Sequence, residues 1–372
     1  MTEVTILGDP ILDPYGVNRV TIFLANFFSR SYDVEVVAAR IAEKVRPQFQ
    51  SGIKLAPLGE RLWAKSPSTA FGESWLREAL ARPNGRAWTR RRCSPGGLVV
   101  NLSNTIVAPA DVWYLQGPVG LAISLTLRQM VNGLGPVVSI ADPVLDLLDH
   151  HQITRTHAAT SIHVANSEYC RSSYSPYGIS VERVIYPPLD TEVFRPATAN
   201  PSEDYCVAYL GKETDPRMLV ALADNGVRIR AFGSKLGKGA MELERHANIT
   251  LVGRLGDREL SQLYSHAKMT IFPFTVEPFG YVPVESMACG TPVLTYDQQG
   301  PAETTEEGRT GWRCHGEAGM IRRAKELWSS SGISREMRER CAQSAARYSV
   351  ENIGREWTEL LRQLSSRKPR SS

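Results

Sequence analysis

Short apolar runs alternate along the chain with longer segments in which apolar residues recur every three or four positions. Residues 4–8 and 34–38 are typical of buried strands, and residues 17–29 between them carry apolar side chains at helical spacing. A loop that contains Gly16 joins the first strand to this helix. The order strand, glycine loop, helix, strand predicts the opening of a doubly wound parallel sheet.

The same alternation starts again after residue 205. The proline-rich residues 187–196 break the periodicity, because paired prolines resist both helix and sheet. We therefore expect an α/β fold with two Rossmann-like, doubly wound domains. The expected division is an N-terminal domain at residues 1–187, a linker at 188–204, a C-terminal domain at 205–347 and a last helix with a basic tail at 348–372.

Residues 40–97 show no clear periodicity. Tryptophans at 63, 75 and 88 stand among arginines at 82, 86 and 90–92. Two interpretations remain open: the 60–92 region is a surface that contacts a membrane interface, or it is a partly buried helical layer followed by a solvated basic loop.

Two carboxylates, a glycine turn and a proline lie within residues 277–294, between two apolar runs. Pro283 suits the first position of a helix over residues 284–289, and Gly290 suits its C-terminal cap. The start of a helix presents unpaired backbone N–H groups that can hold phosphate. Glu277 and Glu285 would repel a phosphate, so we expect them to accept hydrogen bonds from hydroxyl groups. A sugar phosphate offers both kinds of group.

Around these glutamates the motif becomes specific. Glu277 and Glu285 are followed by the sequences Ala-Cys-Gly-Thr-Pro-Val (288–293), Gly-Pro-Ala-Glu (300–303) and Gly-Arg-Thr-Gly (308–311). This run resembles the retaining glycosyltransferases of family 4, also called group 1. The resemblance implies the GT-B fold, in which two Rossmann-like domains face each other across a cleft and the last helix packs back on the N-terminal domain.

The resemblance also implies an activity and the residues of a donor site. The chain would be a retaining hexosyltransferase that moves a sugar from a nucleotide-diphosphate sugar to an acceptor hydroxyl, in glycan biosynthesis. Glu277 would bind hydroxyl groups of the transferred sugar, and Glu285 would bind the ribose. Backbone amides of Phe279, Gly280, Tyr281 and Val282 would contact sugar and phosphate, and Gly253 and Leu255 would lie near the base.

Two cations follow the apolar run that ends at Gly211. Lys212 and Arg217 are expected to stabilise the charge that develops on the leaving diphosphate. The family usually has arginine first and lysine second, so the order is reversed here. With Glu277, these two residues are the expected catalytic groups. We assign no nucleophile, because the family is thought to use same-face attack assisted by the leaving phosphate.

The acceptor side is less well defined by the sequence. Many relatives carry a histidine on a loop of the first domain, where this chain has Gln116 and Gly117. We expect Gly16 and Gln116 on the acceptor side. The expected acceptor is a lipid-linked sugar or a glycan, and a soluble glycoside or a natural product is the alternative. The histidines at 150, 151, 157 and 163 lie on or near helices, where a structural role is the more common one.

Composition adds limits to this picture. The net charge of +4 fits an anionic membrane surface or a phosphate-bearing substrate without requiring either. The six cysteines form no Cys-x-x-Cys pair and suit a cytoplasmic protein with reduced thiols, with peripheral membrane contact as an option. No stretch suggests a signal peptide or a spanning helix. We expect no metal, no cofactor other than the donor substrate, and no nucleic-acid partner.

Two other functions compete with glycosyl transfer. A sugar-nucleotide epimerase also has two Rossmann-like halves, but it needs acid–base groups in the cleft and no separate acceptor, and it does not fit the Glu277–Glu285 run. A catalytically silent GT-B-fold protein would keep the fold only to bind a partner.

Overall fold

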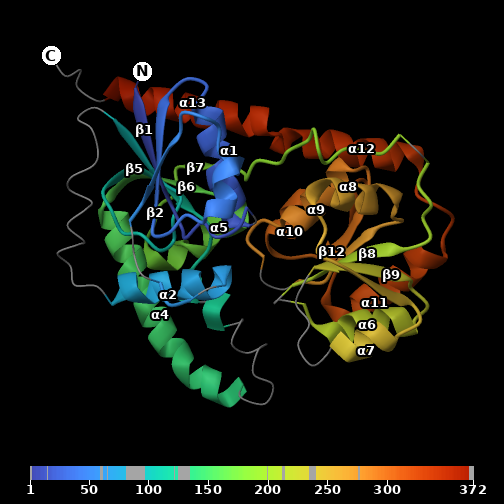
Figure 1. Cartoon of the computed structure of the whole chain (residues 1–372). Helices are drawn as coiled ribbons and strands as arrows, with labels where there is room; N and C mark the ends of the chain where they lie inside the picture. The colour runs from blue at the N-terminus through green and yellow to red at the C-terminus, as the bar shows by residue number, and fades with distance from the viewer. Residues whose placement is uncertain are drawn as a thin grey trace. The chain divides into compact units, whose positions relative to one another are not determined.

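The computed structural model describes two compact units, each built around one parallel sheet (Figure 1). The first unit comprises residues 1–127, 133–188 and 350–372, and the second comprises residues 128–132 and 189–349. The residues described below are 2–14, 16–58, 62–64, 66–80, 97–120, 122–124, 135–198, 200–211, 214–233, 240–274 and 277–367.

The first unit has a seven-stranded parallel sheet in the order β3-β2-β1-β4-β5-β6-β7. Its strands are β1 (Glu3–Gly8), β2 (Asp33–Ala38), β3 (Lys54–Pro57), β4 (Leu98–Asn101), β5 (Ala110–Leu115), β6 (Thr160–Ala165) and β7 (Arg183–Val184). Its helices of six or more residues are α1 (Val17–Phe28), α2 (Pro67–Ala79), α4 (Gly135–Ala158), α5 (Glu168–Ser173) and α13 (Val350–Arg367).

Helices cover both faces of this sheet. Adjacent side chains of a strand point to opposite faces, and in β5 both Trp113 and Tyr114 are buried. The ring of Trp113 packs against Tyr174, with 5.7 Å between centroids, and the ring of Tyr114 packs against Trp357 of α13 at 5.4 Å. The helix α13 therefore covers one face, although residues 189–349 of the second unit precede it in the chain.

The second unit has a six-stranded parallel sheet in the order β10-β9-β8-β11-β12-β13. Its strands are β8 (Cys206–Leu210), β9 (Ile229–Gly233), β10 (Ile249–Gly253), β11 (Thr270–Phe272), β12 (Val293–Tyr296) and β13 (Gly311–Cys314). Its helices are α6 (Pro216–Asp224), α7 (Ala240–Arg245), α8 (Asp257–His266), α9 (Tyr281–Ala288), α10 (Gln299–Thr304), α11 (Gly316–Ser329) and α12 (Arg335–Ala345).

The two ends of the second unit meet each other. Leu189 and Ser349 form an isolated parallel bridge, and the Leu189 amide donates to the Tyr348 carbonyl at 2.7 Å. Near the same end, Arg338 of α12 makes an ion pair with Glu203 at 2.8 Å, and both side chains are largely buried. Arg338 also donates to the backbone carbonyls of Ala267 and Gly290.

The expected fold of two doubly wound parallel sheets is confirmed. The interpretation of residues 40–97 was incomplete, because it missed β3, a short edge strand of four residues. Trp75 of α2 is fully buried, as expected for a helical layer, whereas Trp63 is 86% exposed. Trp88 and the basic residues 82–92 lie outside the described residues.

Candidate functional site

The topology of the second unit defines where a ligand is most easily bound. From β8 the chain adds β9 and β10 on one side, and then crosses to add β11, β12 and β13 on the other. In open parallel sheets, ligands bind at the carboxyl ends of the strands where the order reverses in this way. The reversal falls between β8 and β11, so the loops after these two strands form the candidate site.

Thr214, which precedes α6, contacts the end of β8. The hydroxyl of Thr214 accepts the amide of Gly211 at 2.8 Å and donates to the carbonyl of Tyr209 at 2.9 Å. Lys212, which is expected to face the phosphates, lies outside the described residues. Asp215 is the N-cap of α6 and accepts the amide of Arg217 at 2.9 Å.

Arg217 has a local partner in this structure. Its guanidinium binds the carboxylate of Asp215, with Nη2 to Oδ2 at 2.8 Å, and its side chain is 87% exposed. The same hydrogen bond is the main reason that the pKa of Asp215 is lowered. An arginine on the surface can turn toward a ligand, but it must first give up its ion pair with Asp215.

The loop after β11 is fixed by a reciprocal set of hydrogen bonds around Glu277. Its carboxylate Oε1 accepts the amide of Gly280 at 3.1 Å, and its own amide donates to the side chain of Gln299 at 2.6 Å. Its carbonyl accepts the amide of Gly300 at 3.2 Å. Glu277 is therefore held between the start of α9 and the start of α10.

Two glycines allow this arrangement. Gly280 precedes α9 with φ at 89°, a left-handed conformation that favours glycine. Gly300 lies so close to the loop that a Cβ atom would be 2.2 Å from the carbonyl oxygen of Pro278. Gln299 beside it also has a positive φ of 61°, which is uncommon for a residue with a side chain.

The expected helix over residues 284–289 begins too late, because α9 starts three residues earlier and ends one residue earlier. The helix α9 runs from Tyr281 to Ala288, so Pro283 is its third residue and not its first. Proline is still tolerated there, because the first four amides of a helix have no partner within the helix. The amide of Gly280, expected to contact the ligand, donates to Glu277 in this structure.

Glu285 is part of the packed interior of this unit. Its side chain is 4% exposed, and its carboxylate accepts the hydroxyl of the fully buried Tyr264 at 3.2 Å. The corrected helix start puts Glu285 in the second turn of α9 and not in the first. A buried carboxylate is costly unless it is hydrogen-bonded, so Tyr264 is a supporting residue that the sequence analysis did not identify.

The remaining expected donor residues lie at the same edge of the sheet. Gly253 ends β10, is exposed and has φ at 74°, and Leu255 follows it half-buried. Strand β9 separates β10 from β8. The structure therefore brings Glu277, Phe279 and Gly280 together in one loop, which Tyr281 and Val282 follow as the first residues of α9, with Gly253 and Leu255 two strands away.

The tentative acceptor-side residues belong to the first unit. Gly16 is exposed and precedes α1 with φ at 57°. Gln116 is buried and donates its side-chain amide to the carbonyl of Leu102 at 2.6 Å, which ties the end of β5 to the end of β4. Gln116 therefore stabilises the loop that follows β4.

The sequence analysis missed Asp9, which follows β1 where the strand order of the first unit reverses between β1 and β4. Its Oδ1 atom accepts hydrogen bonds from the hydroxyl of Ser103 at 2.6 Å and from the backbone amide of Asn104 at 3.0 Å. It also accepts from the backbone amide and the hydroxyl of Thr105. Burial raises the pKa of Asp9, and these hydrogen bonds oppose the rise. The backbone of residues 103–105 is thus fixed by one carboxylate.

Two of the histidines, His157 and His163, contact each other within the fold. His163 on β6 is 3% exposed, and its Nε2 lies 3.0 Å from Nδ1 of His157. Burial lowers the pKa of His163, and the neighbouring His157 adds to this effect while Glu182 opposes it.

The described residues contain no group of three or more potential ligands that could hold a metal ion. Among the described helices, none is long and apolar enough to cross a membrane.

A family model supports the sequence resemblance. Residues 219–348 match the model described as Glycosyl transferases group 1, a range that includes Glu277, Glu285, Gly253 and Leu255. Arg217 and Lys212 lie just before this range. A curated relative, D-inositol 3-phosphate glycosyltransferase of Mycobacterium bovis (strain BCG / Pasteur 1173P2), is 28% identical over 207 residues. These cover 49% of this chain and 42% of that protein, so the match spans less than half of the relative.

Solved structures match the chain over nearly its whole length. Sucrose-phosphate synthase (tll1590) from Thermosynechococcus elongatus has a TM-score of 0.72 at 16% identity, covering 98% of this chain and 100% of that chain. Anabaena Alr3699/HepE, in complex with UDP and glucose, has a TM-score of 0.69 at 16% identity, covering 97% and 99%. These likenesses confirm that the two α/β units form the GT-B fold.

Proposed function

We propose that this chain, whose residues 219–348 belong to the group 1 glycosyl transferases, moves a sugar from a nucleotide-diphosphate sugar to an acceptor hydroxyl. One observation carries the proposal: the family match includes Glu277 and the start of α9, and both lie where the strand order of the second sheet reverses. A helix start offers N–H groups and partial positive charge to phosphate. The adjacent carboxylate offers acceptors to sugar hydroxyls.

Each donor residue has a distinct task in this proposal. Glu277 orients the sugar by accepting hydrogen bonds from its hydroxyl groups, while its contact with Gly280 keeps its carboxylate at the start of α9. Glu285 accepts hydrogen bonds from the ribose, and its pairing with Tyr264 holds the carboxylate in place. The region of Gly253 and Leu255 accommodates the base.

The leaving diphosphate needs positive charge as its bond to the sugar breaks. Amides of the first turn of α9 supply part of it, and Lys212 and Arg217 supply whole charges. Arg217 is held by Asp215 before the donor binds, so donor binding requires it to change partners. The proposed reaction retains the configuration of the sugar, with the acceptor attacking on the side from which the phosphate leaves.

A screen of nucleotides tests the donor site directly. UDP is the first ligand to try, because Anabaena Alr3699/HepE is in complex with it, and GDP and ADP follow with their sugars. At about 100 times its Kd, a ligand of the folded state should add about 2.7 kcal/mol to the free energy of unfolding. No thermal shift with any nucleotide would contradict the proposal.

Variants then test the individual residues. Glu277→Gln should lower turnover more than tenfold, which corresponds to about 1.4 kcal/mol or more of activation free energy. Replacing Lys212 and Arg217 together with alanine should weaken nucleoside-diphosphate binding in calorimetry. An NMR assay of the product should show a retained anomeric configuration.

The same assays distinguish the two competing functions. Epimerisation of the donor without any acceptor would favour a sugar-nucleotide epimerase, and nucleotide binding without turnover would favour a catalytically silent GT-B-fold protein.

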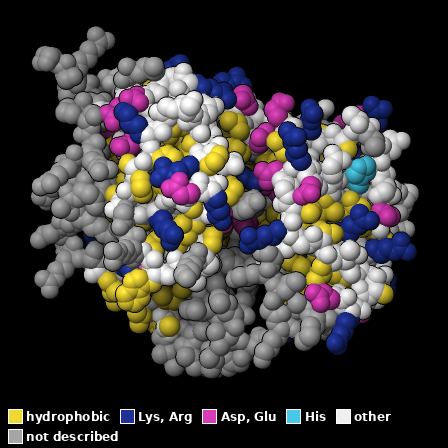
Figure 2. All heavy atoms as spheres, in the orientation of Figure 1, with side chains coloured by type: hydrophobic (Ala, Val, Ile, Leu, Met, Phe, Trp, Pro, Cys, Tyr) yellow, Lys and Arg dark blue, Asp and Glu magenta, His cyan; other side chains and the backbone are white. Residues whose placement is uncertain are grey.

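We also propose that the first unit binds a membrane surface, and that its acceptor is a sugar linked to a lipid in that membrane. Large apolar side chains are exposed on α2 and α4, and Figure 2 shows hydrophobic side chains gathered over these helices. The exposed residues are Trp63, Leu76, Leu80, Val144 and Leu147. The sequence that follows Leu80 carries five arginines up to residue 92, a composition suited to anionic lipid.

Flotation with lipid vesicles tests this contact. The chain should float with vesicles that contain anionic lipid, and float less at high salt or with Leu80→Glu and Leu147→Glu. Equal recovery with uncharged and anionic vesicles would contradict the role of the arginines. No flotation with either would leave a soluble glycoside as the better acceptor.

A further inference from the structure

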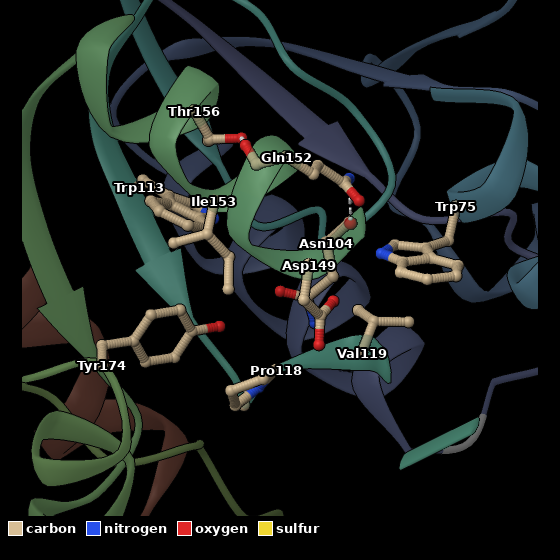
Figure 3. A pocket seen from close by; sticks show the side chains of 11 residues that line it. Trp75, Asn104, Trp113, Pro118, Val119, Asp149, Gln152, Ile153, Thr156 and Tyr174 are labelled. Atoms are coloured by element: carbon tan, nitrogen blue, oxygen red, sulfur yellow. Dashed lines mark hydrogen bonds between the residues drawn. The ribbon is translucent and has the colours of Figure 1, made fainter. Parts of the chain in front are cut away.

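The sugar that this chain is proposed to transfer needs polar partners at a place that a sugar ring can reach. A small pocket lies inside the first unit, between α4 and the loops that follow β4 and β5 (Figure 3). Its volume of about 10 Å³ is too small for a sugar ring. Recognition of the sugar, as proposed above, falls to Glu277 in the loop after β11 of the second unit.

Gln299 has an uncommon backbone conformation beside this loop. Its φ is 61°, and in the described part of the chain Glu203 is the only other residue with a side chain at positive φ. At Glu203 the conformation accompanies a largely buried ion pair with Arg338. Such conformations are costly, and they gather at functional sites where the surrounding structure holds them in place. The strain at Gln299 therefore points to a task that an unstrained residue would not perform.

The hydrogen bonds of Glu277 show what this task is. The side-chain oxygen of Gln299 accepts the amide of Glu277 at 2.6 Å, and the amide of Gly300 donates to the carbonyl of Glu277 at 3.2 Å. Both backbone groups of Glu277 are thus bonded to consecutive residues at the start of α10. Its carboxylate is fixed in turn, because Oε1 accepts the amide of Gly280 at 3.1 Å.

The strained bond of Gln299 controls both contacts with the backbone of Glu277. Rotation about the N–Cα bond of Gln299 moves its side chain and Gly300 together, relative to the strand β12 that precedes them. A return of φ to a negative value would therefore carry both groups away from Glu277. Glycine could adopt this φ without strain, but it has no carboxamide to offer. Glutamine thus favours the position of Glu277 over the stability of the turn.

We propose that Gln299 is a positioning residue for the transferred sugar, because it holds Glu277 where the carboxylate accepts hydrogen bonds from sugar hydroxyls. This inference rests on the proposed function of Glu277. The ribose and the base are assigned to other places, Glu285 within α9 and Gly253 at the end of β10. Gln299 therefore governs how tightly the sugar is held, and not how tightly the nucleotide is held.

Calorimetry with two probes separates the sugar from the nucleotide. The probes are UDP and UDP-glucose, or, if the thermal-shift screen selects GDP or ADP, that nucleotide and its glucose conjugate. Gln299→Ala removes the carboxamide and keeps the Cβ atom. It should raise the ratio of the Kd for UDP-glucose to the Kd for UDP about tenfold, as expected when a hydrogen bond to a charged group is lost. The Kd for UDP itself should change less than about twofold.

Two further measurements need no donor. In Gln299→Ala the amide of Glu277 should exchange with deuterium at least about fivefold faster than in the native chain, because its acceptor is gone. Gln299→Gly also removes the carboxamide, but it relieves the strain. It should therefore unfold at a higher urea concentration than Gln299→Ala, while the ratio of the two Kd values rises equally in both variants. A merely structural role would not separate stability from sugar recognition in this way.

Gln298 offers a matched control. It is the neighbouring glutamine, its side chain is exposed and does not cap α10, and its φ of −159° is that of extended backbone. Gln298→Ala should leave the ratio of the two Kd values and the exchange of the Glu277 amide unchanged.

Three results would overturn the proposal. They are an unchanged ratio in Gln299→Ala, an equal loss of affinity for UDP and UDP-glucose, and native exchange of the Glu277 amide in that variant. Glu277→Gln shows which inference has failed. If Glu277→Gln raises the ratio and Gln299→Ala does not, only the role of Gln299 is wrong. If neither raises it, the proposed role of Glu277 is wrong, and the role of Gln299 falls with it.

Discussion

Replacing Gly300 with alanine tests whether the start of α10 determines the position of Glu277. The new Cβ atom would lie 2.2 Å from the carbonyl oxygen of Pro278 and 2.5 Å from Cα of Phe279. Unbonded atoms pack best at about 3.5–4.0 Å, so the loop or the helix must move by more than about 1 Å. Both contacts are with backbone, which cannot rotate out of the way as a side chain could.

The expected cost follows from this geometry. Overpacking of this kind typically lowers the free energy of unfolding by about 1–3 kcal/mol. A displacement of about 1 Å at a binding loop can lower a reaction rate about 100-fold. We therefore expect Gly300→Ala to lose both stability and donor binding.

Two measurements and one control define the assay. Urea unfolding gives the stability, and calorimetry with UDP gives the affinity. Gly319→Ala is the matched control, because Gly319 lies within α11 and its Cβ would be no closer than 3.8 Å to a neighbour. That change should raise stability by about 0.5–1 kcal/mol and leave UDP binding unaltered. The reasoning is refuted if Gly300→Ala keeps both the stability and the affinity of the parent chain.

Three further predictions concern stability and reactivity. Arg338→Met leaves Glu203 largely buried without its partner, so urea unfolding should show a loss of about 3–5 kcal/mol; a loss below about 1 kcal/mol would contradict this. Burial lowers the pKa of His163 in the folded state, so its contribution to stability is complete above about pH 6.5 and is lost as the pH falls toward the lower folded pKa. His163→Phe should weaken this pH dependence of urea unfolding, and an unchanged slope would count against it. Burial raises the pKa of Cys289 and Cys341 to about 12, so a thiol reagent at pH 8 should label neither until the chain unfolds; rapid labelling of the native chain would disprove their burial.

The fold was largely predictable because buried parallel strands are short continuous apolar runs. Such runs at residues 4–8 and 206–211 gave both sheets. Strand β3 was missed because its residues Lys54–Pro57 are only partly buried and include a charge and a proline. The start of α9 was misplaced because Pro283 suits any early position of a helix, and only Gly280 with its positive φ marks the true beginning.

The candidate site was predictable only as far as one continuous segment carries it. Glu277 and Glu285 follow from the spacing of a motif, and the roles assigned to them stay predictions. Gln299 and Tyr264 support these glutamates through hydrogen bonds that depend on tertiary packing, which one sequence does not reveal. Asp215 is different, because an acidic residue two positions before Arg217 could have suggested the local ion pair.

The bridge between Leu189 and Ser349 changes how the first unit can be assembled. Its final helix, which carries Trp357, is made only after residues 189–349 of the second unit. Closing so long a loop costs conformational entropy, and the cost grows with loop length. Once the second unit is folded, its bridge already holds the two ends of that loop together. The second unit can then serve as an intramolecular template for the first, and a chain cut before Val350 would leave Phe28 and Tyr114 without the ring that covers them.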